Sequence, residues 1–460
     1  MDYRVERDSM GEVRVPTSAY YGASTQRARD NFPISNLRFS RRFIWALGLI
    51  KGSAAVVAGQ RKAITPDVAA AIDRAAADVM AGTLDTNFVL DIFQTGSGTS
   101  TNTNANEVIA ARASELLGTE KRVHPNDQVN YGQSSNDVIP SAIHVAAVAG
   151  IREDLIPGLL RLAAALEARE SEFRDVIKSG RTHLMDATPV TLGQEFGGYA
   201  AQVRSGIARL EKMLPELEEL ALGGTAVGTG INAPAGFAAE VIAVISERSG
   251  LNFREARDHF EAQGGKDATV MAAGVLKTVA ASLFKIANDI RWLGSGPTAG
   301  LGEIRIPDLQ PGSSIMPGKV NPVMSEMMMM VAAHVFGADT AITWGAANGN
   351  FELNVMMPLI SYHLDESIAV LSTASRVFAE KCVEGITANV ERCRQLVERN
   401  VIIVTALNPH IGYDAGAKVA KQALATGRSV REVVLELGLM SSDDLDRALD
   451  LKKMTEGGVL

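Results

Sequence analysis

Cysteine is scarce in this chain, which has 460 residues and only two cysteines, Cys382 and Cys393. An iron–sulfur cluster normally needs three or four thiolate ligands, so the sequence excludes chemistry that depends on such a cluster. Two cysteines are also too few for a disulfide framework, and they lack the spacing of a zinc site. We therefore interpret both as ordinary buried or surface thiols.

The chain also lacks a basic block. Lys and Arg number 45 against 53 Asp and Glu, which gives a formal charge of −8. Neither nucleic acid nor an anionic membrane surface is therefore an expected partner.

Long apolar runs are missing as well. No stretch approaches the roughly 18 uninterrupted apolar residues of a membrane span, and residues 1–8 lack the apolar core of a signal peptide. We expect a cytoplasmic protein. Walker loops and dinucleotide fingerprints are also absent from the sequence. The glycine-rich segment 223–230 follows no strand-like run, which predicts a helix break or a close backbone approach.

Helical periodicity dominates what is present. Aromatic residues make up only 5% of the chain, and abundant Ala and Leu suit close-packed helices. Strand signals are few and lie mostly near the N-terminus. The expected long helical segments are roughly 141–175, 189–220, 236–250, 268–294, 322–347 and 364–385.

This pattern predicts a mainly α protein with three domains. Residues 1–133 should form a mixed, mostly helical domain with polar segments, residues 134–388 a bundle of long helices, and residues 389–460 a small helical domain. Helices of about 25 residues that are apolar on more than one face need neighbours, which favours an oligomer. The methionine run 327–330 is expected to be adaptable packing.

The most informative segment is Gly312–Pro322, with the sequence GSSIMPGKVNP. Its glycines and Pro317 allow the backbone to turn sharply, and Asn321 followed by Pro322 is a good start for the next helix. It combines two hydroxyls, one cation and one amide. The plain alternative is an ordinary connection between helices.

Four further polar segments stand out, and three of them, all except 124–127, precede expected helices. Helix N-termini present unpaired N–H groups and a positive dipole end, both of which suit carboxylates. Plain helix capping is the simpler explanation for any one segment, but several together predict a composite dicarboxylate site. The segments are Thr95–Ser100, His124–Asp127, Gln133–Asp137 and Gly180–Pro189.

Together these segments resemble, in order, the motifs of the fumarase and aspartase superfamily. The similarity runs from about Gly11 to the C-terminal region and is strongest to the class II fumarases, which are iron-independent fumarate hydratases. The resemblance implies a three-domain fold with a long central helix bundle as the core of a homotetramer. It also implies active sites shared between subunits, a small dicarboxylate substrate, and neither a metal nor another cofactor.

The resemblance also assigns roles. The reaction removes a proton next to a carboxylate, so it needs a base and donors around the resulting dianionic group. Ser313 would be the base, assisted by Lys319, and His183, oriented by Glu326, would be the acid acting on water or hydroxyl. The implied substrate-binding residues are Ser97, Thr99, Ser134, Ser135, Asn136, Thr182, Ser314, Lys319 and Asn321.

Other positions discriminate within the superfamily. Aspartases tend to have Gln, Thr and Asn where this chain has His183, Ser135 and Asp127, so fumarate hydration is favoured over aspartate ammonia-lyase activity. A non-catalytic structural homologue is the other alternative, and the intact catalytic set argues against it. No pocket for the large leaving groups of argininosuccinate or adenylosuccinate lyases is indicated.

Two features leave questions open. His124, Asn126 and Asp127 match a second dicarboxylate-binding segment of fumarases, although turn and cap residues are nearly as good an explanation. The chain also departs from the family pattern at Tyr131–Gly132, at Gly264–Lys266 and at Ser325. None of these departures removes a proposed catalytic group.

Overall fold

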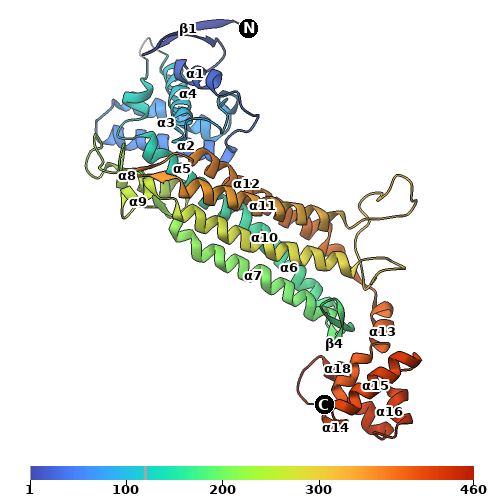
Figure 1. Cartoon of the computed structure of the whole chain (residues 1–460). Coiled ribbons are helices and arrows are strands. Elements are labelled where there is room, and N and C mark those ends of the chain that lie inside the picture. The colour runs from blue at the N-terminus through green and yellow to red at the C-terminus, as the bar shows by residue number, and fades with distance from the viewer. Residues whose placement is uncertain (1, 119–121, 460) are drawn as a thin grey trace. The chain divides into compact units, whose positions relative to one another are not determined.

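The computed structural model describes residues 2–118 and 122–459 (Figure 1). Helices dominate and strands are few, which confirms the mainly α class. The chain divides into two compact units. Unit 1 comprises residues 1–157, 206–281 and 331–373, and unit 2 comprises residues 158–205, 282–330 and 374–460. The three expected domains, bounded at 133/134 and 388/389, stay a prediction.

Unit 1 is built around α2 (Arg41–Gln60), which is buried along most of its length. Ser40 starts this helix, because its side chain accepts the Phe43 N–H as an N-cap. Helix α2 packs against α3, α5 and α8. The helices of this part are α1 (Ala23–Asn31), α3 (Pro66–Met80), α4 (Thr99–Leu117), α5 (Ser135–Gly150), α8 (Phe237–Ser249) and α9 (His259–Gly264).

Short elements connect these helices. Strands β1 (Tyr3–Asp8) and β2 (Gly11–Pro16) form an antiparallel hairpin, where the N-terminal strand signal was expected. The others are β5 (Glu219–Leu220), which pairs with β6 (Arg254–Glu255), β8 (Gly349–Asn350), which pairs with β9 (Leu353–Asn354), the 3₁₀ turn η1 (Asp85–Asn87), and the π-helical segments η2 (Pro125–Val129) and η3 (Ile151–Leu155).

Four long helices contribute residues to both units (Figure 1): α7 (Leu192–Leu217), α10 (Asp267–Leu293), α11 (Val323–Ala347) and α12 (Met357–Lys381). Their positions follow the helical periods of the sequence, except that α7 starts three residues later than expected and α12 starts before 364. By length and composition α2 and α10 could each cross a membrane, but 78% of the apolar window of α2 is buried in the chain, against 44% for α10. The buried position of α2 in the core accounts for the hydropathy of this helix.

Unit 2 contains a hairpin that was not expected. Strands β3 (Ile177–Thr182) and β4 (Met185–Thr191) pair antiparallel, with Ser179 opposite Pro189. Thr188 and Pro189 therefore do not start a helix, because Pro189 lies in a strand and α7 begins after it. The unit also includes α6 (Ile156–Glu172), which begins at the end of unit 1, and β7 (Ile304–Arg305), which pairs with β10 (Thr387–Ala388).

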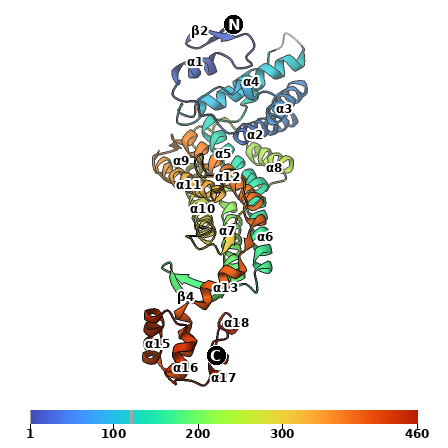
Figure 2. The ribbon, with the colours of Figure 1, turned by 90° about the vertical axis from the view of Figure 1, so that its right-hand side faces the viewer.

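The C-terminal part of unit 2 has a hydrophobic core of its own. Buried residues such as Leu407, Val419, Val433 and Leu445 form one cluster there, and the red helices lie close together in Figure 2. The elements are η4 (Val383–Gly385), α13 (Val390–Glu398), η5 (Val401–Leu407), α14 (Asn408–Ile411), α15 (Tyr413–Thr426), α16 (Val430–Glu436), α17 (Ser442–Ala448) and α18 (Leu451–Met454).

A buried carboxyl joins α12 to the start of α2 within unit 1. Ser40 Oγ donates to Asp365 Oδ2 at 2.6 Å while it caps α2. Burial raises the pKa of Asp365 from 3.8 to about 7, against the Ser40 hydrogen bond and the charge of Arg42. Because the folded protein holds this proton more tightly than the unfolded chain, the contribution of Asp365 to stability is fully present below pH 3.8 and is lost as the pH rises to about 7.

Asp365→Asn should remove this loss, since the amide has the same shape and stays neutral. We expect the melting temperature of the variant, relative to the natural chain, to be higher at about pH 8 than at about pH 5. Asp175→Asn is the control, because Lys452 lowers the pKa of that exposed carboxyl, and it should not gain stability with pH. A difference in melting temperature between Asp365→Asn and the natural chain that stays constant with pH would contradict the prediction.

Candidate active site

Ser97 and Thr99 lie together where α4 begins, in unit 1. Their hydroxyl oxygens are 2.8 Å apart. Gly96 fixes this turn because its carbonyl accepts the Met357 N–H at 3.0 Å, and a Cβ on Gly96 would lie 1.8 Å from the Val355 carbonyl oxygen. The helix starts at Thr99, so both hydroxyls stand at its N-terminus.

The segment Ser134–Asn136 starts α5. Ser134 is the N-cap and forms a capping box with Asp137, so Ser135 and Asn136 lie in the first turn of the helix. The Asp137 carboxylate accepts N–H bonds from Ser134 at 2.9 Å and from Gly223 and Thr225 at 3.0 Å each. Burial raises the pKa of Asp137, while these donors and Lys51 act in the opposite direction.

The glycine-rich segment 223–230 lies against this start of α5, as the expectation of a close backbone approach required. Asn136 Nδ2 donates to the Ala226 carbonyl at 2.7 Å. A Cβ on Gly224 would lie 2.0 Å from Gln263 Oε1, so any side chain there would displace Gln263. The segment therefore supports the backbone around Asn136.

The candidate second site lies on a separate π-helical segment. His124 is its N-cap, and Nδ1 accepts the Asp127 N–H at 3.0 Å. The Asp127 carboxylate is 3.2 Å from the same nitrogen. His124, Asn126 and Asp127 are all exposed, so the three side chains are open to a ligand, although their capping role alone also explains them.

In unit 2, His183 occupies the tip of the β3–β4 hairpin. Thr182 pairs with Met185, and His183 and Leu184 between them have φ values of 55° and 61°. Left-handed backbone costs roughly 1–2 kcal/mol for each such residue. Thr182 and His183 are exposed, so the tip presents the imidazole to its surroundings at the expense of local strain.

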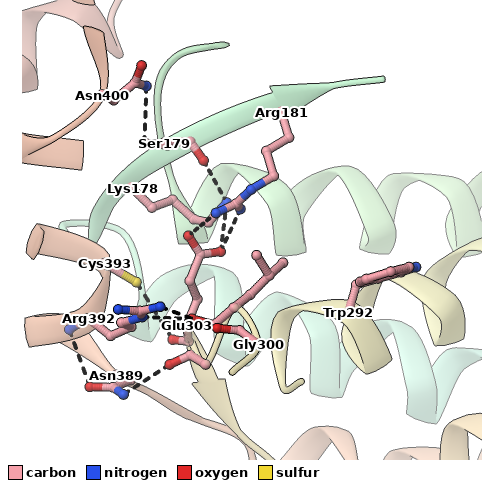
Figure 3. A network of polar contacts seen from close by, with 12 residues as sticks. Lys178, Ser179, Arg181, Trp292, Gly300, Glu303, Asn389, Arg392, Cys393 and Asn400 are labelled. Carbon is pink, nitrogen blue, oxygen red and sulfur yellow. Dashed lines mark hydrogen bonds and ion pairs between the residues drawn. The ribbon is translucent and has the colours of Figure 1, made fainter. Parts of the chain in front are cut away.

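A buried ion network holds the base of this hairpin (Figure 3). The Glu303 carboxylate accepts both Arg181 guanidinium N–H groups at 2.9 Å and lies 3.3 Å from Lys178 Nζ. Lys178 Nζ also donates to Glu195 at 2.7 Å. Lys178 and Glu303 are completely buried, so the charges stabilise one another without water.

The loop 312–322 is closed at its base by hydrogen bonds. Gly312 N donates to the Lys319 carbonyl at 2.7 Å, and Asn321 Nδ2 donates to the Gly312 carbonyl at 2.8 Å. Helix α11 begins at Val323, so Asn321 does not occupy the cap position that the sequence predicted. The two ends approach so closely that a Cβ on Gly312 would be 2.6 Å from the Lys319 carbonyl oxygen.

Within the loop, Ser313 Oγ accepts two backbone N–H bonds, from Ile315 at 3.2 Å and from Met316 at 3.0 Å. Ser314, Lys319 and Glu326 are exposed. A cavity of about 970 Å³ lies beside the loop and is lined by Lys319 and Asn321. Its charged lining residues are Arg291, Arg305, Asp308 and Lys319, a positive balance that suits an anion.

Unit 1 thus brings Ser97, Thr99 and the Ser134–Asn136 segment near α4, since Asn102 on α4 bonds to Ser135 at 3.0 Å. Unit 2 gathers Ser313, Lys319 and Asn321 in one loop. Within the described part of the chain, no hydrogen bond or ion pair joins His183 to Glu326. The same residues contain no group of three His, Cys, Asp or Glu side chains placed to hold a metal ion.

Comparison with known proteins identifies the family. Residues 11–337 match the model of the lyase family, and residues 403–456 match that of the fumarase C C-terminus. The class II fumarate hydratase of Mycobacterium tuberculosis (strain ATCC 25618 / H37Rv) is 53% identical over 99% of this chain and 96% of its own length. The chain belongs to the class II fumarate hydratase family of lyases.

Solved structures agree with this membership. The recombinant class II fumarase of Schistosoma mansoni is 37% identical, with a TM-score of 0.97 over 99% of each chain. A cobalt-bound fumarate lyase:delta crystallin from Brucella melitensis is 44% identical, with a TM-score of 0.93 over 99% of this chain and 100% of that one. The fumarase fold implied by the sequence is therefore confirmed.

The departures from the family pattern have local explanations in two of three cases. The Tyr131 ring meets the Phe237 ring edge to face at 5.6 Å. Lys266 Nζ donates to the carbonyls of Ala262 and Gln263 at 2.8 and 3.0 Å, which satisfies the end of α9. Ser325 is buried, and nothing in the structure explains its hydroxyl.

This family member also contains polar residues that the sequence analysis missed. Lys51 is completely buried in α2, and Asn102 and Asn130 lie behind Ser135. A lysine inside an apolar helix was the one signal that could have found them. The two cysteines fit the expectation of ordinary thiols, because burial raises the pKa of Cys382 and of Cys393 to about 12.

Replacing Glu303 by glutamine should destabilise the fold. Removing one partner of a buried ion pair leaves an uncompensated charge and typically costs about 3–5 kcal/mol. We expect a loss near the lower end of that range in the free energy of unfolding by denaturant, because Glu195 still faces Lys178. The control is Glu167→Gln in the exposed pair with Arg204, which should cost less than about 1 kcal/mol. Equal losses of unfolding free energy in the two variants would show that the Glu303 network stabilises the fold no more than an exposed ion pair does.

Proposed function

We propose that this enzyme reversibly hydrates fumarate to L-malate by general acid and base catalysis, through a carbanion whose charge lies on the aci-carboxylate, without a metal or other cofactor. The class II fumarate hydratases it resembles along its whole length support the reaction. The observation that carries the mechanism is the hydrogen bonding of Ser313.

Ser313 is the proposed base that removes the C–H proton. An unassisted serine hydroxyl is far too weak a base for this proton, so its oxyanion must be stabilised. Its Oγ already accepts the N–H groups of Ile315 and Met316, and such fixed donors favour a negative oxygen over a neutral one. Lys319 in the same loop supplies a positive charge. Closure of the loop over substrate would exclude water and strengthen both effects.

His183 is the proposed acid that protonates the departing hydroxyl or, in the reverse direction, activates water. Imidazole exchanges protons readily near neutral pH. Its exposed place at the hairpin tip lets a second subunit reach it. Glu326 is also exposed, and we propose that it orients His183 across a subunit boundary.

The substrate carboxylates would be bound by hydroxyl and amide donors and one cation. In unit 1 these donors stand at the starts of α4 and α5, where the helix N-termini add N–H groups. In unit 2 they lie on the hairpin and on the loop beside a cavity with positive lining. The proposed set is Ser97, Thr99, Ser134, Ser135, Asn136, Thr182, Ser314, Lys319 and Asn321.

A homotetramer with shared sites is part of the proposal. Large apolar side chains are exposed on the long helices of the isolated chain, including Met330 at 68% and Trp344 at 70%. Such residues mark surfaces that neighbours cover. We also propose a cytoplasmic location, and binding of a dicarboxylate by His124, Asn126 and Asp127 as a second, non-catalytic site.

The reaction is tested by following the ultraviolet absorbance of fumarate with purified protein. We expect absorbance to fall in buffer alone, with the same rate when ammonia or a chelator is added. Lack of turnover with water would overturn the proposal. Turnover only with ammonia would select aspartate ammonia-lyase activity, turnover under no condition would select the non-catalytic homologue, and inhibition by the chelator would contradict a metal-free mechanism.

Shared sites predict complementation between inactive chains. His183→Asn and Ser313→Ala should each abolish turnover, and mixing the two under verified subunit exchange should restore it. In an equal random mixture about a quarter of the sites would draw both intact residues from different chains. A mixture of His183→Asn with His183→Ala is the control and should stay inactive. Absence of recovery in the first mixture would refute sites composed from several subunits.

A further inference from the structure

A buried polar chain in unit 1 leads from α2 to Ser135, and the proposed reaction does not use it. Lys51 is completely buried, and its Nζ donates to Asn130 Oδ1 at 2.7 Å. The same Asn130 oxygen accepts N–H bonds from Asn102 at 3.3 Å and from Asn106 at 3.2 Å. Burying the Lys51 ammonium group with the amides of Asn102 and Asn106 is costly, so their arrangement calls for a reason beyond packing.

Lys51 fixes which end of the Asn130 amide faces it. An ammonium group has donors and no acceptor, so the atom opposite it must be the carbonyl oxygen. At the other end, Asn130 Nδ2 donates to the Gln133 carbonyl at 3.0 Å, and a carbonyl only accepts. Burial lowers the pKa of Lys51 to about 7, and Asp137 acts in the opposite direction. The neutral amine also has a lone pair, but the Gln133 carbonyl still requires the NH₂ group of Asn130 opposite it, so this polarity survives deprotonation.

The fixed polarity then passes to Ser135. Because Asn130 presents its oxygen, Asn102 must turn its NH₂ group toward it, and that same Nδ2 lies 3.0 Å from Ser135 Oγ. Ser135 Oγ must therefore accept this bond. A hydroxyl has one proton and two lone pairs, so its proton remains available. Among the described residues, no protein acceptor takes it.

We propose that Lys51 is a positioning residue which, through Asn130 and Asn102, makes Ser135 present its O–H proton to a substrate carboxylate. With the opposite polarity, Ser135 would turn a lone pair toward the anion and repel it. The inference rests on the proposed function, since it assumes that Ser135 binds the carboxylate of fumarate. It adds a role for three residues that do not themselves touch the substrate.

A double-mutant cycle tests this link. The variants are Lys51→Met, which keeps an unbranched apolar stem but removes the amine and its donors, Ser135→Ala, and the combination. Losing one hydrogen bond to a charged group should raise the KM for fumarate on the order of tenfold in each single variant. If Lys51 acts through Ser135, the double variant should have the same KM as Ser135→Ala alone. If the effects of Lys51→Met and Ser135→Ala on KM instead multiply in the double variant, the proposal is overturned.

Lys266→Met is the matched control. Lys266 is also a buried lysine of unit 1, but its Nζ bonds to the carbonyls of α9. Any effect of its replacement on KM should multiply with that of Ser135→Ala. A purely structural role for Lys51 would make the two lysine variants behave alike.

Asn102→Leu provides a second route if Lys51→Met does not fold. It removes the last link before Ser135, and its effect on KM should likewise vanish in the Ser135→Ala background. The natural chain is assayed first. No fumarate turnover there would overturn the proposed function together with this inference, whereas multiplied effects in an active enzyme would overturn the role of Lys51 alone.

Discussion

The rest of the structure depends on a single constraint, namely that a buried carboxylate must be surrounded by donors. Asp137 meets it in unit 1 by accepting three backbone N–H groups from two segments. Glu303 meets it in unit 2 by binding Arg181 and Lys178. Because an unpaired buried charge is so unfavourable, each carboxylate allows only one arrangement of the backbone around it. Each therefore determines the position of a candidate site segment, Ser134–Asn136 in the first case and the β3–β4 hairpin in the second.

The polar residues of this protein consequently fall into two groups, those of the candidate site and those that support them. The first group, the hydroxyls, amides and imidazole of the candidate site, is mostly exposed or half-buried. The second group lies mostly buried behind it and holds it in place. The glycine-rich segment 223–230 also supports the candidate site. Its N–H groups donate to Asp137, and its Ala226 carbonyl accepts a hydrogen bond from Asn136. Its glycines allow close packing of the backbone against neighbouring side chains.

Much of this architecture could be predicted from the sequence because it is encoded locally. The long helices follow the apolar period, and the loop 312–322 follows its glycines and prolines. Three features could not be predicted that way. The β3–β4 hairpin is short and contains Pro189, which suggested a helix start. Asn321 bonds back to Gly312 rather than capping α11. Lys51, Asn102 and Asn130 lie far apart in the sequence, and only the packed helices bring them together, so no motif records their contact.

The hairpin tip has a consequence for how this family is compared. A two-residue turn with both φ values positive is most easily made by Asn-Gly, yet this chain has His183 and Leu184 there. A descendant that lost its catalytic task would gain stability by replacing them, and nothing in the β3–β4 pairing would resist the change. Under the role proposed for His183, the two residues between Thr182 and Met185 mark selection for chemistry. An enzyme that has become a structural protein should reveal itself at this turn before its core changes.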